Sequence, residues 1–290
     1  MRNVYKFSMQ AAACLAFLAV SALCSAKAED TSCEPAKLAT KYPGLAGKTI
    51  KIGQDGESVP FSMRDPKEFT KLIGLDADLA RVTFACIGVP VQFTIGTWSG
   101  LIPAAMSGQI DVMWDTLLYT PERAKKLDFV VYMNAATGML VAKGNPKNIH
   151  ALGDLCGLTG TTALGTTQEA MLREGSSKCV AAGKPAINII TSTDMPSGLR
   201  LVQNARADLV AVNKFVGESM IAANPTTVES AFDVITGAKI AVGTAKGNPD
   251  LVKALRDGLT AVRASGVEKE IYERYHVDYS LTVEPVILTE

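Results

Sequence analysis

Apolar residues along the chain recur with two alternating periods, one of two residues and one of three to four. Residues 49–53 alternate apolar and polar positions, as a half-buried strand does. Leu75, Leu79 and Val82 recur at the spacing of one helix face. The same patterns predict strands at 89–95, 111–114, 158–162, 187–190 and 208–212, and helices at 99–106, from 121, from about 166, and at 194–203, 214–223, 249–264 and 267–275. Strands alternating with helices of this length predict an α/β fold with largely parallel sheets.

The starts of two predicted helices have recognisable caps. Ser99 opens the helix at 99–106, and its hydroxyl can accept from the first free amides. Thr120 precedes Pro121, which is a capping hydroxyl followed by proline at the first helical position. Residues 29–48 are polar and carry two prolines, so we expect an irregular segment before the first strand.

A weak internal similarity suggests two related lobes. Residues 107–112 and residues 204–209 each leave a predicted helix and enter a predicted strand that begins with aspartate. Two similar lobes would explain this echo. Coincidence is the alternative, because helix-turn-strand junctions often look alike.

The N-terminal segment has the features of a secretory signal peptide. Arg2 and Lys6 form a positive region, residues 11–23 are apolar but short for a bilayer, and Ala26-Lys27-Ala28 is a small-x-small cleavage pattern. We expect residues 1–28 to be removed after Ala28, leaving 262 of the 290 residues. An N-terminal membrane anchor is the alternative. No later segment is long and apolar enough to cross a membrane, so we expect a soluble, exported protein.

Composition and charge exclude several classes of protein. Hydrophobic residues make up 48% and charged residues 20%, which is too apolar for a disordered chain. The 29 basic and 29 acidic residues balance, and without the basic signal segment the chain is slightly acidic. A nucleic-acid partner is therefore not expected. His150 and His276 are the only histidines, which argues against a histidine triad or a histidine-rich metal site.

Four cysteines remain in the expected mature chain, and an even number in an exported protein predicts disulfides. Three pairings are possible. We favour Cys156–Cys179, which closes a moderate loop within one region and leaves Cys33–Cys86. Free buried thiols are the alternative. The sequence has no CxxC pair, so we expect no zinc site.

Two predicted helix starts could bind an anion. Arg123 follows Thr120-Pro121, where its guanidinium can grip a carboxylate with two parallel bonds. A solvated surface arginine is the alternative. Thr166 and Thr167 lie in a Gly-Thr-Thr-Gln turn between a strand and a helix, where amides and hydroxyls can face an anion. Ordinary capping is the alternative there, and without the lysine of a phosphate-binding loop a nucleotide is not expected.

Three further residues could contribute to a ligand site. Asp55 follows the first strand, and open α/β sheets place ligand contacts at the carboxyl ends of their strands. Trp98 precedes a helix start and offers a flat face for an apolar stem or a cation. Asp115 ends a strand. Turn aspartates and a core tryptophan are the alternatives.

A set of short segments follows one another in a characteristic order over about residues 47–276. The segments are Ile50-Lys51-Ile52-Gly53 with Asp55, Pro60-Phe61, Gly74-Leu75-Asp76-Ala77-Asp78-Leu79-Ala80, Trp98-Ser99-Gly100-Leu101-Ile102-Pro103-Ala104, Gly108-Gln109-Ile110-Asp111, Thr120-Pro121-Glu122-Arg123, Leu127-Asp128-Phe129, Asp154-Leu155, Gly165-Thr166-Thr167-Gln168-Glu169, Arg206-Ala207-Asp208, and Gly266 with Ile271-Tyr272. No single segment is decisive, but the ordered set is specific. In this order the sequence resembles the polar amino-acid-binding proteins of bacterial ABC importers, the family 3 solute-binding proteins.

The resemblance implies the type II periplasmic-binding fold, with two α/β lobes joined by a two-strand hinge. Lobe 1 would take residues 29–137 and 239–290, and lobe 2 residues 138–238. The ligand would lie in the cleft between the lobes, and closure would be a hinge motion.

The resemblance also implies roles for particular residues. Arg123 would bind the ligand α-carboxylate, assisted by Thr116, Leu118 and Thr167. Asp55 would face the ligand side chain or ammonium group, and Trp98 would form a wall of the pocket.

Three positions depart from the family pattern. Leu118 replaces a common Ser or Thr, so only its backbone could contribute there. Asn213 stands where the family usually has an acid for the α-ammonium group, and Ser58 where an aromatic residue is common. Asp115 could supply the missing negative charge. The identity of the ligand therefore stays open between a standard amino acid and a derivative.

The expected function is that of a monomeric carrier that delivers its ligand to the membrane permease subunits of an ABC importer. No catalytic residue, metal or cofactor is expected in this interpretation. Two alternatives remain on the same scaffold. A dehydratase-type enzyme would need a general acid in the cleft, which Asp55 or Asp115 could provide. A periplasmic ligand sensor is the other alternative.

Overall fold

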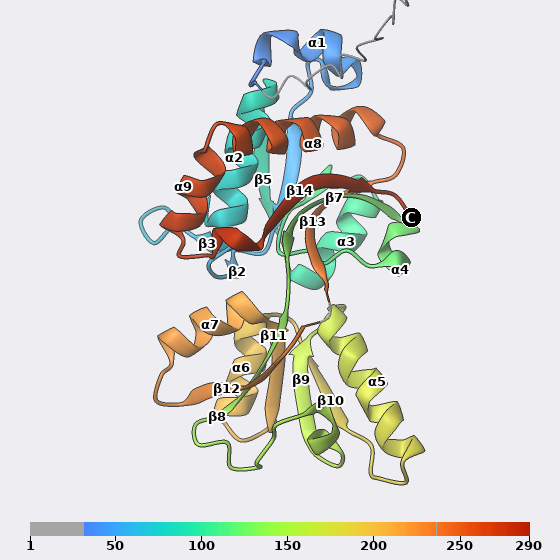
Figure 1. The fold of residues 1–290 in the computed structure, drawn as a ribbon, viewed down its shortest axis with the longest axis vertical. Coiled ribbons are helices and arrows are strands. Elements are labelled where there is room, and N and C mark those ends of the chain that lie inside the picture. Colours follow the sequence, from blue (N-terminus) through green and yellow to red (C-terminus); the bar gives the residue numbers. More distant parts are fainter. Residues whose placement is uncertain (1–31, 236) are drawn as a thin grey trace, which may run out of the picture. The chain divides into compact units, whose positions relative to one another are not determined.

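The computed structural model of the protein describes residues 32–235 and 237–290 (Figure 1). The expected signal peptide, residues 1–28 with its cleavage site after Ala28, lies outside these residues. Among the described residues, no helix combines the length and the apolar character that a membrane crossing needs. The segment before the first strand is more regular than expected, because it holds the short helix α1 (Leu38–Lys41) between two 3-10 turns.

A six-stranded sheet, called the first sheet below, has the strand order β14-β7-β13-β6-β1-β5. Its strands are β1 (Ile50–Gln54), β5 (Val91–Ile95), β6 (Val112–Met113), β7 (Leu127–Asn134), β13 (Lys239–Ala245) and β14 (Thr282–Leu288). β1 runs parallel to β5 and β6. β13 is antiparallel to β6 and β7, and β14 is antiparallel to β7.

A five-stranded sheet, the second sheet, has the order β10-β9-β11-β8-β12. Its strands are β8 (Thr137–Ala142), β9 (Thr159–Ala163), β10 (Asn188–Ser192), β11 (Leu209–Asn213) and β12 (Val228–Val234). β9 is parallel to β10 and β11, whereas β8 is antiparallel to β11 and β12. A small antiparallel sheet is formed by β2 (Glu57–Ser58), β3 (Ser62–Arg64) and β4 (Leu72–Ile73).

The α/β class is confirmed, but the expectation of largely parallel sheets is wrong. Each large sheet has a parallel part built from alternating strands and helices, and an antiparallel part built from β7 and β13 or from β8 and β12. These four strands belong to the two stretches of chain that pass between the sheets. Because β7 leaves the first sheet and β13 returns to it, the two necessarily run in opposite directions.

Helices cover the faces of both large sheets (Figure 1). The helices around the first sheet are α2 (Leu75–Ile87), α3 (Trp98–Met106), α4 (Pro121–Ala124), α8 (Pro249–Ala264) and α9 (Val267–Arg274). The second sheet has α5 (Thr167–Ala181), α6 (Met195–Gln203) and α7 (Lys214–Ala223). α8 packs on α2, β7 and β14, whereas α3 packs on β1, β6 and β13.

Strand β7 shows why the first sheet needs helices on both faces. Val130 and Tyr132 belong to the core that includes α2 and α8, whereas Phe129 and Val131 belong to the core around α3. All four side chains are buried. Successive side chains of a strand point to opposite faces, so an uninterrupted apolar run requires a covering layer on each side.

Two passages connect the first and second sheets. The first links β7 to β8 through residues 135–136, and the second links β12 to β13. The passages are hydrogen-bonded to each other, since the Ala135 N–H donates to the Ala238 carbonyl at 2.8 Å. The predicted lobe ranges 29–137, 138–238 and 239–290 change close to these passages, and the division itself stays a prediction.

The helix-capping predictions are confirmed at one start and wrong at another. The Thr120 hydroxyl accepts from the Arg123 N–H at 3.1 Å, as the Thr-Pro pattern predicts. Ser99 does not cap α3, because the helix begins one residue earlier than expected, at Trp98, after Thr97 in extended geometry. Ser99 therefore lies inside the first turn rather than before it.

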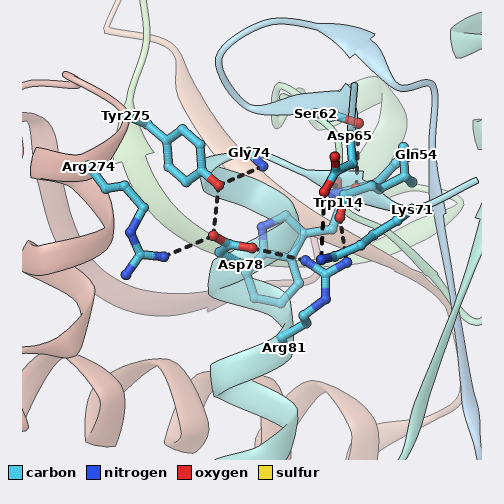
Figure 2. Close-up of polar contacts among 11 residues, drawn as sticks. Gln54, Ser62, Asp65, Lys71, Gly74, Asp78, Arg81, Trp114, Arg274 and Tyr275 are labelled. Atoms are coloured by element: carbon cyan, nitrogen blue, oxygen red, sulfur yellow. Dashed lines mark hydrogen bonds and ion pairs between the residues drawn. The ribbon is translucent and has the colours of Figure 1, made fainter. Parts of the chain in front are cut away.

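The C-terminal helix α9 is tied to the start of α2 by a polar network around Asp78 (Figure 2). Asp78 Oδ2 accepts from the Tyr275 hydroxyl at 2.7 Å and from Arg274 at 3.1 Å. Asp78 Oδ1 accepts from Arg81 at 2.9 Å. The Tyr275 hydroxyl in turn accepts from the Gly74 N–H at 3.0 Å. The turn from which α2 begins is therefore held by residues 200 positions later in the chain.

Both predicted disulfides are confirmed. Cys156 pairs with Cys179 at a separation of 23 residues, and Cys33 pairs with Cys86 at a separation of 53. The first joins the segment before β9 to the last turn of α5, and the second joins the N-terminal segment to the last turn of α2. Each cross-link therefore fastens a peripheral segment to a helix that packs on a sheet.

The Cys156→Ala/Cys179→Ala double variant is expected to lose about 3 kcal/mol of unfolding free energy, because opening a loop of this length raises the entropy of the unfolded chain. Urea unfolding of both proteins measures the loss. Peptide mapping of the unreduced wild-type protein should recover the two cysteines in one linked fragment. Two free thiols, or an unchanged urea midpoint in the variant, would contradict the expectation.

Candidate functional site

Seven of the ten predicted ligand-binding residues meet around one small cavity between elements of the two large sheets. The cavity has a volume of about 10 Å³, which is about the space of one water molecule. The predicted residues that line it are Trp98, Thr116, Leu118, Arg123, Thr166, Thr167 and Asn213. Gln168 and Met195 complete the lining, and the sequence analysis did not single them out as ligand contacts.

Arg123 is a cation that has no anionic partner in the part of the chain that the structure describes. Its guanidinium donates to the Leu118 carbonyl at 2.7 Å and across to the Gly165 carbonyl at 3.0 Å. It also lies over the Trp98 ring, 5.6 Å from the centroid. Among the described residues, no carboxylate forms an ion pair with it. Burial lowers the pKa of Arg123 to about 10, because no neighbouring charge stabilises the guanidinium cation.

Trp98 is fixed by the strand end that follows α3. Its indole N–H donates to the Asp115 carbonyl at 3.2 Å, and the side chain is buried in the core around α3. The Arg123 guanidinium lies over its ring. Trp98 therefore forms both part of the core and a wall of the cavity.

Thr116 lies in the left-handed backbone region, with φ of +48°, which is uncommon for a branched residue. Its N–H donates to Asp76 Oδ2 at 2.8 Å. Asp76 Oδ1 accepts from the Tyr132 hydroxyl at 2.6 Å. Asp76, in the first turn of α2, thus holds this wall of the cavity, a role that the sequence analysis missed.

Asp55, Ser58 and Asp115 do not line the cavity but form a buried group next to Trp98 and Thr116. Asp55 accepts from the Ser58 hydroxyl at 2.9 Å and from two backbone N–H groups. The Asp55 N–H donates to Asp115 Oδ2 at 2.7 Å. Burial raises the pKa of Asp55, and burial together with the Asp55 charge raises the pKa of Asp115 well above its ordinary value.

On the second sheet, Thr166 makes the contacts of an ordinary cap. Its hydroxyl accepts from the Glu169 N–H at 3.1 Å and donates to the Ala163 carbonyl at 2.8 Å. The Thr167 hydroxyl donates to Gln168 at 3.2 Å. The side chains of both threonines therefore have local partners, while the start of α5 still faces the cavity.

Asn213 ends β11 and caps α7. Its side-chain oxygen accepts from the Phe215 N–H at 3.0 Å. Its side-chain nitrogen has no hydrogen-bond partner among the described residues, and the residue is only 4% exposed. The cavity therefore has a second donor besides Arg123, at the position where the family resemblance leads one to expect an acid.

A larger hollow of about 1060 Å³ lies elsewhere, beside α7 and the segment after α9. Three of the charged side chains that line it already have partners. Lys214 pairs with Asp233 and Glu218, and Arg274 pairs with Asp78. A binding site needs polar groups that are free to converge on a ligand. The small cavity at Arg123 meets that requirement better than the larger hollow.

Sequence comparisons match most of the chain to one protein family. The model of the family described as bacterial extracellular solute-binding proteins, family 3, matches residues 50–278. The L-cystine-binding protein TcyJ of Escherichia coli K12 is 25% identical over 78% of this chain and 82% of its own length. A probable histidine-binding protein of Neisseria gonorrhoeae is 25% identical over 94% of this chain and 96% of its own length.

Solved structures give the same result for the fold. An ancestral arginine-binding protein bound to arginine superposes with a TM-score of 0.72 and 28% identity, over 80% of this chain and 99% of that one. The ancestral amino acid-binding protein AncCDT-1, a precursor of cyclohexadienyl dehydratase, superposes with a TM-score of 0.69 and 28% identity, over 81% of this chain and 99% of that one.

Proposed function

Because the chain belongs to the bacterial extracellular solute-binding proteins of family 3, we propose that it is the monomeric binding protein of an ABC importer and carries an amino acid or an amino-acid derivative. The names of its relatives support this ligand class. Export to the periplasm, with cleavage after Ala28, is part of the proposal. The loaded protein would deliver its ligand to the membrane permease subunits.

The unpaired guanidinium of Arg123 is the observation that carries this proposal. A partly buried cation without an anion is costly unless a ligand supplies one. Its guanidinium donates to two carbonyl groups, one beside the first sheet and one beside the second. A ligand carboxylate that replaced one of these carbonyls would pair the charge and still bridge the two sides.

Ligand entry requires that the two sides separate. The cavity of about 10 Å³ has room for about one water molecule and not for an amino acid. We therefore assign residues 29–137 and 239–290 to lobe 1 and residues 138–238 to lobe 2, and place the hinge at the two passages between the sheets. Ligand contacts to both lobes would then favour the closed arrangement.

A thermal-shift screen of the twenty amino acids, their N-acyl derivatives and small carboxylates tests the function. A compound at a hundred times its dissociation constant should stabilise the protein by about 2.7 kcal/mol. Amines of matched side chain that lack the carboxylate are the control, and they should produce no shift. Stabilisation by the amines as strong as by the acids would contradict the proposal.

Trp98 should report ligand binding through its fluorescence. Trp114 is the only other tryptophan and is fully buried against Tyr132, 5.9 Å away between ring centroids. A ligand that stabilises the wild-type protein should therefore change its emission, and the Trp98→Phe variant should lose most of that change while still binding. An unchanged ligand response in Trp98→Phe would place Trp98 outside the site.

An enzyme or a sensor on this scaffold would differ in what happens after binding. A dehydratase would release a new product from a bound carboxylate, and Asp55 and Asp115 would be its acid candidates. Neither of these acids lines the cavity. Incubation of the protein with each stabilising compound, followed by product analysis, should return the compound unchanged. Steady turnover would favour the enzyme, and a receptor partner in place of a permease would favour the sensor.

A further inference from the structure

We propose that the ligand is a carboxylate whose α-substituent is an uncharged oxygen-bearing group, as in a 2-hydroxy, 2-oxo or N-acylamino acid, and that Asn213 donates to that oxygen. This inference rests on the proposed function, because it assigns the ligand carboxylate to Arg123. It narrows the ligand class from amino acids and their derivatives to compounds without an α-ammonium group.

The orientation of the Asn213 amide is set by its own helix. The side-chain oxygen accepts from the Phe215 N–H at 3.0 Å and so caps α7. A flipped amide would place its NH2 group against that N–H and would lose the cap. The side-chain nitrogen of Asn213 is therefore the group left to contact a ligand, and it is buried without a partner among the described residues. A buried donor of this kind is costly until an acceptor satisfies it.

The charges around the cavity also favour a ligand without an α-ammonium group. Arg123 is the one charged residue in the described lining, and no acid belongs to it. Arg123 and Asn213 are both donors, so the ligand has to supply acceptors to each of them. An α-ammonium group beside Asn213 would bring its positive charge near the Arg123 guanidinium and leave the Asn213 donor unsatisfied.

The nearest acids are engaged elsewhere. Glu169 accepts from the Gly165 N–H at 2.7 Å and pairs with Arg173 at 2.6 Å. Asp76 holds Thr116 and Tyr132 through its two oxygens. Each of these oxygens already has a donor, and neither acid belongs to the described lining of the cavity.

Asp55 and Asp115 are two further acids near the cavity. Both Asp55 oxygens accept hydrogen bonds from residues 57 and 58. Asp115 has one unpartnered oxygen, but the residue is fully buried outside the lining, and burial together with the neighbouring Asp55 charge raises its pKa and so favours its protonated form. An ammonium group that reached Asp115 is the competing interpretation, and it would make amino-acid binding depend on that residue.

Calorimetry on the full mature protein with matched compounds tests the inference. The probes are the twenty L-amino acids, their N-acetyl derivatives, and the 2-hydroxy and 2-oxo acids with the same side chains. For the side chain that binds best, at least one compound with an uncharged α-substituent should bind about tenfold or more tightly than the amino acid, which is the effect of one buried hydrogen bond. The Asn213→Asp variant should reverse this preference, because it replaces the donor by an anion.

Asn248→Asp is the matched control, because Asn248 caps α8 in the same way and lies away from the cavity. It should leave every affinity unchanged. Tightest wild-type binding by an L-amino acid, lost in Asp115→Asn, would overturn the inference while leaving the proposed function intact. Tightest binding by an L-amino acid that Asp115→Asn leaves unchanged would overturn the inference as well. Absence of saturable binding by every compound would overturn both.

Discussion

Arg123→Ala is expected to weaken ligand binding at least about thirtyfold while leaving the ligand-free protein folded. Truncating one partner of a buried charge pair typically costs about 2–5 kcal/mol, because the other charge loses its compensation. Each 1.4 kcal/mol corresponds to about tenfold in affinity. The loss should appear for every carboxylate that binds, since the contact is to the group that these compounds share.

Arg123→Lys should recover only part of the affinity, because an ammonium group cannot make two parallel bonds to a carboxylate. Calorimetry with the compound that stabilises the wild-type protein most strongly gives the affinities, and thermal melts without ligand check the fold. Arg206→Ala is the matched control, because Arg206 is exposed in the loop before β11. Near-wild-type affinity in a folded Arg123→Ala protein would show that the carboxylate is held elsewhere or that the ligand has none.

The helices with a clear apolar face and a cap were predictable from the sequence. The predicted helices at 214–223 and 249–264 have the same ends as α7 and α8. Asn213 caps the first and Asn248 the second, with side-chain oxygens that accept from the first turn. Local chemistry determines these ends, so no knowledge of the rest of the chain is required.

The strands that pass between the two sheets were not predictable in the same way. Residues 129–133 of β7 are all buried and apolar, so they lack the alternation of a half-buried strand. Periodicity alone does not separate such a run from part of a buried helix. The antiparallel direction of β7, β8, β12 and β13 depends on the path of the chain between the sheets, which no local pattern records.

The candidate site was predictable where a residue type follows an element end. Arg123, Thr167 and Asn213 all lie at such ends and line the cavity. Asp76 was missed as a site residue because an acid in the first turn of a helix is common for local reasons. Its partners Thr116 and Tyr132 are 40 and 56 residues away in the chain. The side-chain nitrogen of Asn213 is left for a ligand because the side-chain oxygen accepts from the Phe215 N–H, a contact that the sequence does not show.

The Asp76 carboxyl should make the protein less stable as the pH rises from about 4 to 7. Burial, with a smaller contribution from the Asp55 charge, raises the pKa of Asp76 from 3.8 to about 7 in the folded protein, even though the hydrogen bonds from Tyr132 and Thr116 lower it. Between pH 3.8 and about pH 7, Asp76 keeps its proton in the folded state but has lost it in the unfolded state. The unfolded state then binds fewer protons, so the unfolding free energy falls with pH.

Asp76→Asn should remove this contribution and keep the site in place. The asparagine oxygen can accept from the Thr116 N–H, while its NH2 group can donate to the Tyr132 oxygen, so both contacts have a replacement. Because asparagine does not ionise, the variant should gain about 2–3 kcal/mol of unfolding free energy relative to wild type between pH 5 and pH 8. Urea unfolding of both proteins at the two pH values measures the change.

Asp111→Asn separates this effect from the loss of an acceptor oxygen. Asp111 accepts from the Lys51 N–H at 2.8 Å but is only half-buried, and it lies away from the cavity. If the two variants change equally between pH 5 and pH 8, the burial of Asp76 is not the cause. A pH-dependent gain confined to Asp76→Asn would show that ionisation of the buried Asp76 carboxyl destabilises the folded protein. If this variant also keeps its ligand affinity at pH 5, the oxygen at position 76, and not its charge, holds Thr116 in its left-handed conformation at the cavity.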